Sequence, residues 1–587
     1  ATVIFSILNL CVLCVFAVNT FLTTKTGKTQ SNLNMFRLLV VLLYLTPVVL
    51  FPLHAHSQSL IDYTHYPLQV TNSTPPNVLI LLDNSESMHQ QAYEGDFDPL
   101  KSYDGYFQPA TSYSYVSDSY FEINPLGGWN GNFLNWLTMR RIDLVRKVLT
   151  GGKTLPNSRT GSGIQFLLGE DTGLTDYKIL KQYQEGAGTF YPEQVELGLE
   201  TGSPVYFGLH NGHIYAGSSS DPFARDSMQF TIQVKKDALL EPDEFMDGNS
   251  SGLIHTMSRK IRLGLALFNT DGEGGHIANP IGGELNSLVS TIEQCEMTSM
   301  SPLAEALFEC VRYFMQITPY YFHNPPDYRL EEQDDPFFFQ EVSQKIPCAQ
   351  SFIILVTDGE STHDQTIPAS PPQEASGNLR DYDGDGVEPL LSPEEGSGYL
   401  DDIALWAHTS DLRTRDSELE GPQHITLFTV HAFGAGSSLL KDAAKNGGFI
   451  DMNGNSLPDL NQEWDSNHDG IPDTFYEAGD ASRLGEKLLQ VAADIMNRSA
   501  SESGITIVPN PLDHESSLFQ ASYKPYFPPD GKEVTWLGFL HALWIDGFGN
   551  IREDRDGDKA LVYERDKIIR YTFDEGSGET RAGNVSD

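Results

Sequence analysis

The chain alternates between continuous apolar runs and amphipathic segments over much of its length. The apolar runs fit strands that are buried on both faces, and the amphipathic segments fit helices that cover a sheet. The strand-like runs are "NVLILL" at 77–82, "KIRLGLALFN", "SFIILVT" and "HITLFTVHAFG". The helix-like segments are "PLAEALFECVRYF", "SSLLKDAAKNGG" and "ASRLGEKLLQVAADIM". This alternation predicts an α/β fold with a doubly wound, mostly parallel sheet.

Two long segments interrupt the alternation. Residues 90–131 are rich in Tyr, Ser, Asp and Gly, which predicts an irregular surface excursion, and residues 153–258 form a second insertion with strand signals. Between them, "NFLNWLTMRRIDLVRKVLTGG" predicts one helix that is capped by Asn132 and stopped by Gly151 and Gly152. Its apolar face consists of Leu134, Leu137, Ile142, Val145 and Val148.

Both ends of the chain differ from the central region. Residues 35–57 combine a short basic start, an apolar run and small residues, which predicts an export signal, and residues 1–34 read as an upstream or leader segment. A membrane anchor is the alternative for this end. Residues 58–75 form a polar linker, and residues 504–587 predict the start of a β-rich module. The region 76–503 is then the α/β domain with its insertions.

Composition narrows the class of protein. The 587 residues are 40% hydrophobic, so the chain can bury real cores, and the formal net charge is −42. Such an acidic chain is not expected to bind nucleic acid, because contacts with phosphates need an excess of Lys and Arg. Of the five cysteines, Cys295, Cys310 and Cys348 follow the export signal, and any of their three pairings is allowed.

Oxygen-bearing side chains follow two of the buried strands and precede one helix. Ligands of doubly wound sheets bind outside the carboxyl ends of the strands, so we expect these side chains to meet there. Carboxylates and hydroxyls without His or Cys favour a hard cation, Mg²⁺ or Mn²⁺. The candidate ligands are Asp83, Ser85, Ser87, Ser301 and Asp358.

The order of these motifs resembles a von Willebrand factor A (VWA) domain with a metal-ion-dependent adhesion site. In that family a partner carboxylate completes the metal shell, so the resemblance implies adhesion and no enzymatic activity. Ser301 stands where the family usually has Thr. "PNVLILLDNSESM", "WNGNFLNWLTMRRIDLVRKVL", "SPLAEALFECVRYF", "PCAQSFIILVTDGES" and "YLDDIALWAHTSDLR" further resemble the PilY-type tip adhesin and assembly proteins of bacterial type IV pili.

The PilY resemblance implies a place in the cell and a set of partners. It implies an exported protein in the periplasm, at the cell surface or at the pilus tip of a Gram-negative bacterium, with possible outer-membrane association. The implied partners are pilins or minor pilins and a host or abiotic surface. Family members typically continue into a C-terminal β-propeller, so we expect this chain to be a fragment or a shortened form.

Short acidic stretches at 381–388 and 451–477 place oxygen side chains at alternate positions, as calcium loops do. Residues 451–481 contain no Lys or Arg, so a bound Ca²⁺ would relieve repulsion there. The alternative is a solvated turn without metal. The candidate Ca²⁺ ligands are Asp381, Asp383, Asp385, Asp451, Asn453, Asn455, Asp459, Glu463, Asp465, Asn467, Asp469, Asp473 and Glu477.

Two other functions stay open at this point. A metal-dependent hydrolase on the same sheet would use Asp83 or Ser85 as nucleophile and a base among His89, His363 and Asp364. A metal-chelatase subunit uses a similar domain, but the export signal argues against this cytosolic role.

Overall fold

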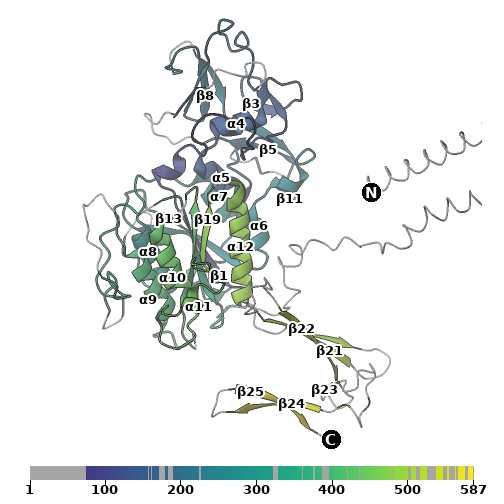
Figure 1. The fold of residues 1–587 in the computed structure, drawn as a ribbon, viewed down its shortest axis with the longest axis vertical. Coiled ribbons are helices and arrows are strands. Elements are labelled where there is room, and N and C mark those ends of the chain that lie inside the picture. The colour runs from purple at the N-terminus through teal and green to yellow at the C-terminus, as the bar shows by residue number, and fades with distance from the viewer. Residues whose placement is uncertain are drawn as a thin grey trace, which may run out of the picture. The chain divides into compact units, whose positions relative to one another are not determined.

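The structure is a computed structural model (Figure 1). It describes residues 74–499, with gaps at 156–157, 160, 171–178, 183–189, 224–226, 322–327, 341, 360, 374–376, 387–395, 420, 435 and 480. Beyond residue 499 it describes six strands and residues 562 and 566. The expected leader, export signal and most of the linker lie outside the described residues. Among those residues, no helix has both the length and the apolar character needed to cross a membrane.

A six-stranded sheet organises the region between residues 77 and 499. Its order β14-β13-β1-β17-β18-β19 is the 3-2-1-4-5-6 order of a doubly wound fold, and only the edge strand β14 is antiparallel. The predicted fold class is therefore confirmed. The strands are β1 (Asn77–Leu82), β13 (Arg262–Phe268), β14 (Gly275–Asn279), β17 (Ser351–Thr357), β18 (Ile425–Ala432) and β19 (Phe475–Ala478).

Alternate residues of the buried strands face two separate cores. In β1, Leu79 and Leu81 belong to one core, whereas Val78, Ile80 and Leu82 belong to the other. The first core is covered by α8 (Leu303–Phe314), α9 (Leu400–Thr409) and α10 (Ser438–Gly448). The second is covered by α5 (Arg141–Thr150), α6 (Leu253–Met257), α7 (Leu285–Gln294) and α12 (Ala481–Ser499), as Figure 1 shows.

The segment expected to be an irregular excursion is instead folded around an aromatic core. Tyr106, Tyr113 and Phe121 are all inaccessible to solvent, and aromatic rings from both insertions pack against them. The alternation of aromatic and small polar residues marked strands there, and the sequence interpretation missed it. The five-stranded sheet of this region comprises β2 (Ser112–Val116), β3 (Tyr120–Ile123), β4 (Trp129–Asn130), β5 (Ile164–Leu168) and β10 (Gln233–Asp237).

The single helix predicted after this segment is two helices. Helix α4 spans Gly131–Thr138, and α5 begins at Arg141 after an extended break at Met139 and Arg140. Asn130, and not Asn132, caps α4, because its side chain accepts a hydrogen bond from the Phe133 N–H at 3.1 Å. Gly151 ends α5 in the left-handed conformation, as predicted.

The remaining elements are short or lie toward the end of the chain. The second insertion adds the sheet β6 (Ile179–Gln182), β7 (Tyr206–His210), β8 (His213–Gly217) and β9 (Met228–Thr231), and the pair β11 (Phe245–Met246) with β12 (Asn249–Ser250). A further pair, β15 (Phe338–Phe339) with β16 (Gln344–Lys345), lies between α8 and β17. Short helices are η1 (Glu86–His89), η2 (Pro242–Glu244), η3 (Glu332–Asp334) and α11 (Asn461–Trp464).

The C-terminal segment forms an antiparallel meander, in agreement with the β-rich character expected from its sequence. Its strands are β20 (Gly504–Pro509), β21 (Ser516–Lys524), β22 (Leu537–Ile545), β23 (Ile551–Glu553), β24 (Ile568–Asp574) and β25 (Glu579–Val585). Among the cysteines, Cys295 and Cys310 are buried in cores on opposite faces of the central sheet, and Cys348 is exposed.

Candidate metal site

The parallel register of β1 and β17 places Asp83 beside Thr357. Leu82 pairs with Val356, and the Asp83 N–H donates to the Val356 carbonyl at 2.9 Å. The Thr357 hydroxyl then donates to Asp83 Oδ2 at 2.6 Å. Two segments that are 274 residues apart in sequence are thus joined at the carboxyl edge of the sheet.

A chain of oxygen contacts continues from Asp83 to Asp358. The Ser85 N–H donates to Asp83 Oδ1 at 2.7 Å, and the hydroxyls of Ser85 and Ser87 lie 2.8 Å apart. The Ser87 hydroxyl donates to Asp358 Oδ1 at 2.7 Å. Four of the five predicted magnesium ligands therefore form one connected cluster.

Ser301, the fifth predicted ligand, lies in a segment that is tied to the same edge. Its N–H donates to Thr362 Oγ1 at 2.8 Å, and Thr362 N–H donates back to the Ser301 carbonyl at 2.9 Å. Three residues earlier, Thr298 forms a parallel bridge with Ser85. No hydrogen bond among the described residues joins the Ser301 hydroxyl to either aspartate, so its role as a ligand stays a prediction.

Burial makes negative charge in the cluster energetically costly. Asp83 is fully buried, and this burial, with the nearby Asp358 carboxylate, raises the pKa of Asp83 to about 6. Two adjacent carboxylates in a poorly solvated place need a cation or a proton. The donor set consists of carboxylate and hydroxyl oxygens only, which fits Mg²⁺ or Mn²⁺ better than a softer metal.

Arg141 supplies a positive charge that the sequence interpretation did not anticipate. Its Nη1 lies 2.7 Å from Asp358 Oδ2, and the arginine also pairs with the exposed Glu94 at 3.6 Å. Arg141 is the first residue of α5, where its N–H donates to the Gln90 carbonyl at 3.1 Å. The arginine pair in "TMRRID" was the available signal. Because the sequence interpretation placed one helix through this stretch, it did not predict that Arg141 points toward the sheet edge.

A second hydroxyl near the cluster was also missed. The Thr298 side chain is 1% exposed, and its hydroxyl has no hydrogen-bond partner among the described residues. Its N–H donates to the Asn84 carbonyl at 3.0 Å, and the Asn84 side chain binds the Phe268 backbone at the end of β13. The cluster of hydroxyl residues in "TSMS" ahead of α8 could have indicated both Thr298 and Ser301.

The first acidic loop gathers carboxylates from more than one element. Carboxylate oxygens of Asp381, Asp383 and Asp385 lie within 4.8 Å of one another. Asp401 and Asp402, at the start of α9, are buried beside them, and Asp402 Oδ1 accepts the Asp383 N–H at 3.3 Å. Burial first, then the neighbouring carboxylates led by Asp402, raise the pKa of Asp401 to about 8.

The second acidic loop is folded by its own side chains. The exposed Asp451 carboxylate accepts backbone N–H groups from residues 453–456, which lowers its pKa. The amides of Asn453 and Asn455 donate to the two oxygens of Asp459 at 2.8 and 2.9 Å. Glu463 is buried and accepts the N–H groups of Met452 and Leu460, so it caps α11.

The third loop has the same local construction. Asp465 accepts the N–H groups of Asp469 and Gly470 at 3.0 and 2.9 Å, and Asn467 donates to Asp469 at 3.1 Å. Asp473 closes the loop by accepting the Ser466 N–H at 3.2 Å. Glu477 instead lies in β19 and accepts the Gly436 N–H at 2.6 Å, outside the loop. Calcium binding at all three loops stays a prediction.

Comparison with known proteins identifies one part of this chain. Residues 90–166 match a protein family described as "PilY1 homolog, small alpha/beta domain". This segment is therefore similar to the PilY1-type α/β domain. It contains α4, α5 and Arg141, so the PilY resemblance seen in the sequence is confirmed there. No curated protein sequence matches the chain.

Two solved pilus proteins show weak structural likeness. The vWF domain of the type V pili tip protein Mfa5 from Porphyromonas gingivalis has 10% identity and a TM-score of 0.24, with coverage of 42% of this chain and 83% of that domain. The open pilus adhesin SpaC from Lactobacillus rhamnosus GG has 9% identity and a TM-score of 0.23, with coverage of 81% and 54%. The chain thus spans about half of SpaC. Likeness at this level carries no functional argument.

Proposed function

We propose that this chain is an exported, metal-dependent adhesion protein of the type IV pilus system. Its site would hold Mg²⁺ or Mn²⁺ through Asp83, Ser85, Ser87, Ser301 and Asp358, and a partner carboxylate would complete the metal shell. The connected oxygen cluster at the sheet edge is the observation that carries the proposal. The PilY1-type segment supports the pilus context, with a pilin or a surface ligand as partner and the cell surface or pilus tip as location.

Two of the three candidate bases of the hydrolase alternative are poorly placed for catalysis, whereas the half-buried His363 stays open as a base. Of the candidate bases, His89 is 1% exposed, and burial followed by nearby cations lowers its pKa to about 3. Asp364 is fully buried and accepts the N–H groups of Ala304 and Glu305 at the start of α8. Neither group can approach a substrate, so a general base at the cluster has no good candidate among these two residues.

Titration calorimetry of the full chain after chelation tests the magnesium site. We expect Asp83→Ala to weaken Mg²⁺ binding at least 100-fold, because it removes the buried carboxylate at the centre of the cluster. Asp243→Ala, at an exposed position, is the matched control. Unchanged Mg²⁺ affinity in Asp83→Ala would refute the proposal.

Adhesion needs its own measurement. We expect a glutamate-containing peptide to bind the Mg²⁺-loaded protein more tightly than its glutamine counterpart, and Asp83→Ala to abolish that difference. Equal binding of the two peptides would contradict recognition of a carboxylate through the metal.

We further propose that the acidic loops bind Ca²⁺, and that Asp401 and Asp402 take part at the first loop. The support is the gathering of five carboxylates from two elements there and the local acidic turns at 451–473. Asp469→Ala should remove one Ca²⁺ site and leave Mg²⁺ binding at Asp83 unchanged. Calorimetry with Ca²⁺ that gives the same number of sites in wild type and Asp469→Ala would overturn the assignment of the third loop.

A further inference from the structure

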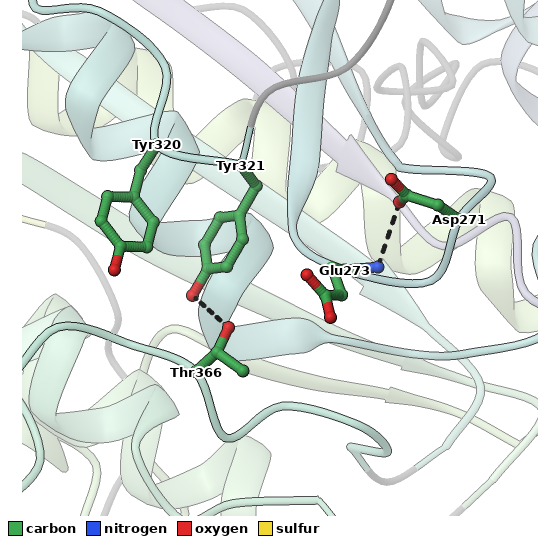
Figure 2. A pocket seen from close by; sticks show the side chains of 5 residues that line it. All are labelled: Asp271, Glu273, Tyr320, Tyr321 and Thr366. Atoms are coloured by element: carbon green, nitrogen blue, oxygen red, sulfur yellow. Dashed lines mark hydrogen bonds between the residues drawn. The ribbon is translucent and has the colours of Figure 1, made fainter.

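A surface cavity of about 360 Å³ lies between the loop after β13 and the segment after α8. Its lining residues are Asp271, Glu273, Tyr320, Tyr321 and Thr366. Figure 2 shows the two carboxylates on one side of the view and the two tyrosine rings on the other. No part of the predicted metal sites uses these five residues.

The aromatic wall of the cavity is held in place by buried groups. The N–H groups of Tyr320 and Tyr321 both donate to Glu309 Oε1, at 2.6 and 3.0 Å, and the two rings meet edge to face at 5.0 Å. The hydroxyls of Tyr321 and Thr366 lie 3.3 Å apart (Figure 2). These contacts fix the positions of the two tyrosines before any ligand binds.

The acidic wall is fitted closely against Tyr321. Gly274 has a φ of +64°, and a Cβ there would lie 2.4 Å from Tyr321 Cγ, so only glycine lets the loop pass this ring. Asp271 and Glu273 precede this close approach and are both exposed. Their carboxylates can thus reach a ligand in the cavity, where Tyr320 is the exposed ring.

A third carboxyl group lies beneath the cavity. Glu305 is fully buried, and this burial, followed by the nearby Asp364 carboxylate, raises its pKa to about 7. It accepts the N–H groups of Gly274 at 2.9 Å and Thr366 at 2.8 Å, one from each side of the cavity. Among the described residues, no ion pair joins Asp271, Glu273 or Glu305 to Lys or Arg. The nearby Arg312 donates to the Thr318 carbonyl and pairs with Glu309 at 3.8 Å. Its guanidinium also lies 5.7 Å from the centre of the Tyr320 ring, so this wall already packs against one cation of the chain itself.

We propose that this cavity binds a lysine or arginine side chain of a partner protein. The exposed carboxylates of Asp271 and Glu273 at its rim attract a cation, and the exposed ring of Tyr320 stabilises a cationic group with its alkyl stem. An anionic or purely apolar ligand would meet repulsion or unpaired carboxylates in the same place. The occupant is therefore defined by charge complementarity.

The cavity also lies close to the proposed metal site. A Cβ on Gly272 would be 2.8 Å from Met300 Cγ, so the acidic loop contacts the residue before Ser301. Thr362, which binds Ser301, stands four residues before Thr366. A partner segment with an acidic and a basic side chain would then contact both places. This last step rests on the proposed adhesive function, whereas the cation pocket does not.

Binding of a small cationic probe to the full chain tests the pocket. The probe is Nα-acetyl-lysine methylamide, its neutral control carries an Nε-acetyl group, and binding is followed by NMR. We expect the lysine probe to bind and the neutral control not to bind. The double variant Asp271→Asn with Glu273→Gln should weaken binding of the lysine probe at least fivefold. Glu193→Gln with Glu196→Gln changes two exposed glutamates elsewhere and should leave binding unchanged.

Two results would overturn the proposal. One is equal binding of the neutral probe, and the other is equal affinity in the pocket and control variants. Tyr320→Leu provides an independent check, because Tyr320 is 48% exposed and its loss removes an aromatic face with little risk to folding. This variant should weaken the lysine probe at least twofold, and unchanged binding counts against a role for the ring.

Asp83→Ala separates failure of the pocket from failure of the metal site. It should leave binding of the lysine probe unchanged while Mg²⁺ binding is lost. A peptide with Asp and Lys separated by two glycines should bind the Mg²⁺-loaded protein more tightly than its Asn or norleucine versions. If only the norleucine change has no effect, binding of a basic side chain in the cavity is refuted and the metal site stands.

Discussion

The oxygen cluster at Asp83 and the acidic loops at 451–473 contain similar residues but are built in different ways. The cluster joins segments that are 274 residues apart, and its central carboxylate is fully buried. In the loops, the acidic side chains accept hydrogen bonds from backbone groups only a few residues away, and most of these side chains are exposed. The sheet creates the first arrangement, whereas Asx-type turns create the second.

This difference separates a site that depends on the fold from sites that are local. In the cluster, the two carboxylates are poorly solvated. Each hydrogen-bond partner of these carboxylates therefore affects the stability of the fold as well as metal binding. In the loops, water can replace a lost partner. Substitutions of similar size should therefore have unequal effects in the two regions.

The largest expected effect is on stability, from Thr357→Val. The Thr357 hydroxyl is fully buried and donates to Asp83, so its removal leaves that carboxylate short of a partner and should cost about 2 kcal/mol. Asn455→Ala in the second loop removes an exposed amide and should change stability by less than about 0.5 kcal/mol. Chemical denaturation of chelated protein measures both.

Thr291→Val is a control for the threonine substitution itself, because this hydroxyl serves only the Ser287 carbonyl on the outside of α7. Equal losses for Thr357→Val and Asn455→Ala would remove the contrast between the two regions.

An intermediate effect is expected from Arg141→Gln. The guanidinium neutralises Asp358 at 2.7 Å and so competes with a divalent cation for the same carboxylate. Its loss should tighten Mg²⁺ binding about tenfold, which corresponds to about 1.4 kcal/mol, and should leave Ca²⁺ binding at the loops unchanged. Calorimetry of the variant gives both affinities.

Weaker Mg²⁺ binding in Arg141→Gln would show instead that the arginine positions Asp358. Either change would make the PilY1-type segment part of the metal site, because Arg141 belongs to it. Arg259→Gln provides a matched control at a distant, exposed arginine.

The sequence predicted the central sheet and its carboxyl edge because both depend on continuous apolar runs, which can be recognised in the sequence. The four apolar runs at β1, β13, β17 and β18 became buried strands, and residues directly after β1 and β17 came together through parallel register. It did not predict Arg141, since the approach of this residue depends on a break at Met139 and Arg140 within a continuous helical pattern.

The aromatic first insertion was harder to predict for a different reason. Its Tyr- and Ser-rich segments have a surface-like composition, and they are buried only because rings between Phe97 and Phe230 pack on one another. Such a core depends on contacts between distant segments, so the local alternation that marked its strands did not reveal that they are buried. The cavity at Tyr320 is likewise formed by three segments that are separate in sequence.

The smallest expected effect concerns Glu463, for which sequence and structure indicate different roles. The loop pattern predicts a Ca²⁺ ligand, yet both carboxylate oxygens of this buried residue accept backbone N–H groups. If capping is its role, Glu463→Gln should cost about 1 kcal/mol of stability and leave Ca²⁺ affinity within twofold of wild type. A much larger loss of Ca²⁺ affinity, absent from the exposed control Glu196→Gln, would show that the second loop draws a ligand from the core. The distinction between a local and a fold-dependent site would then no longer separate the two regions.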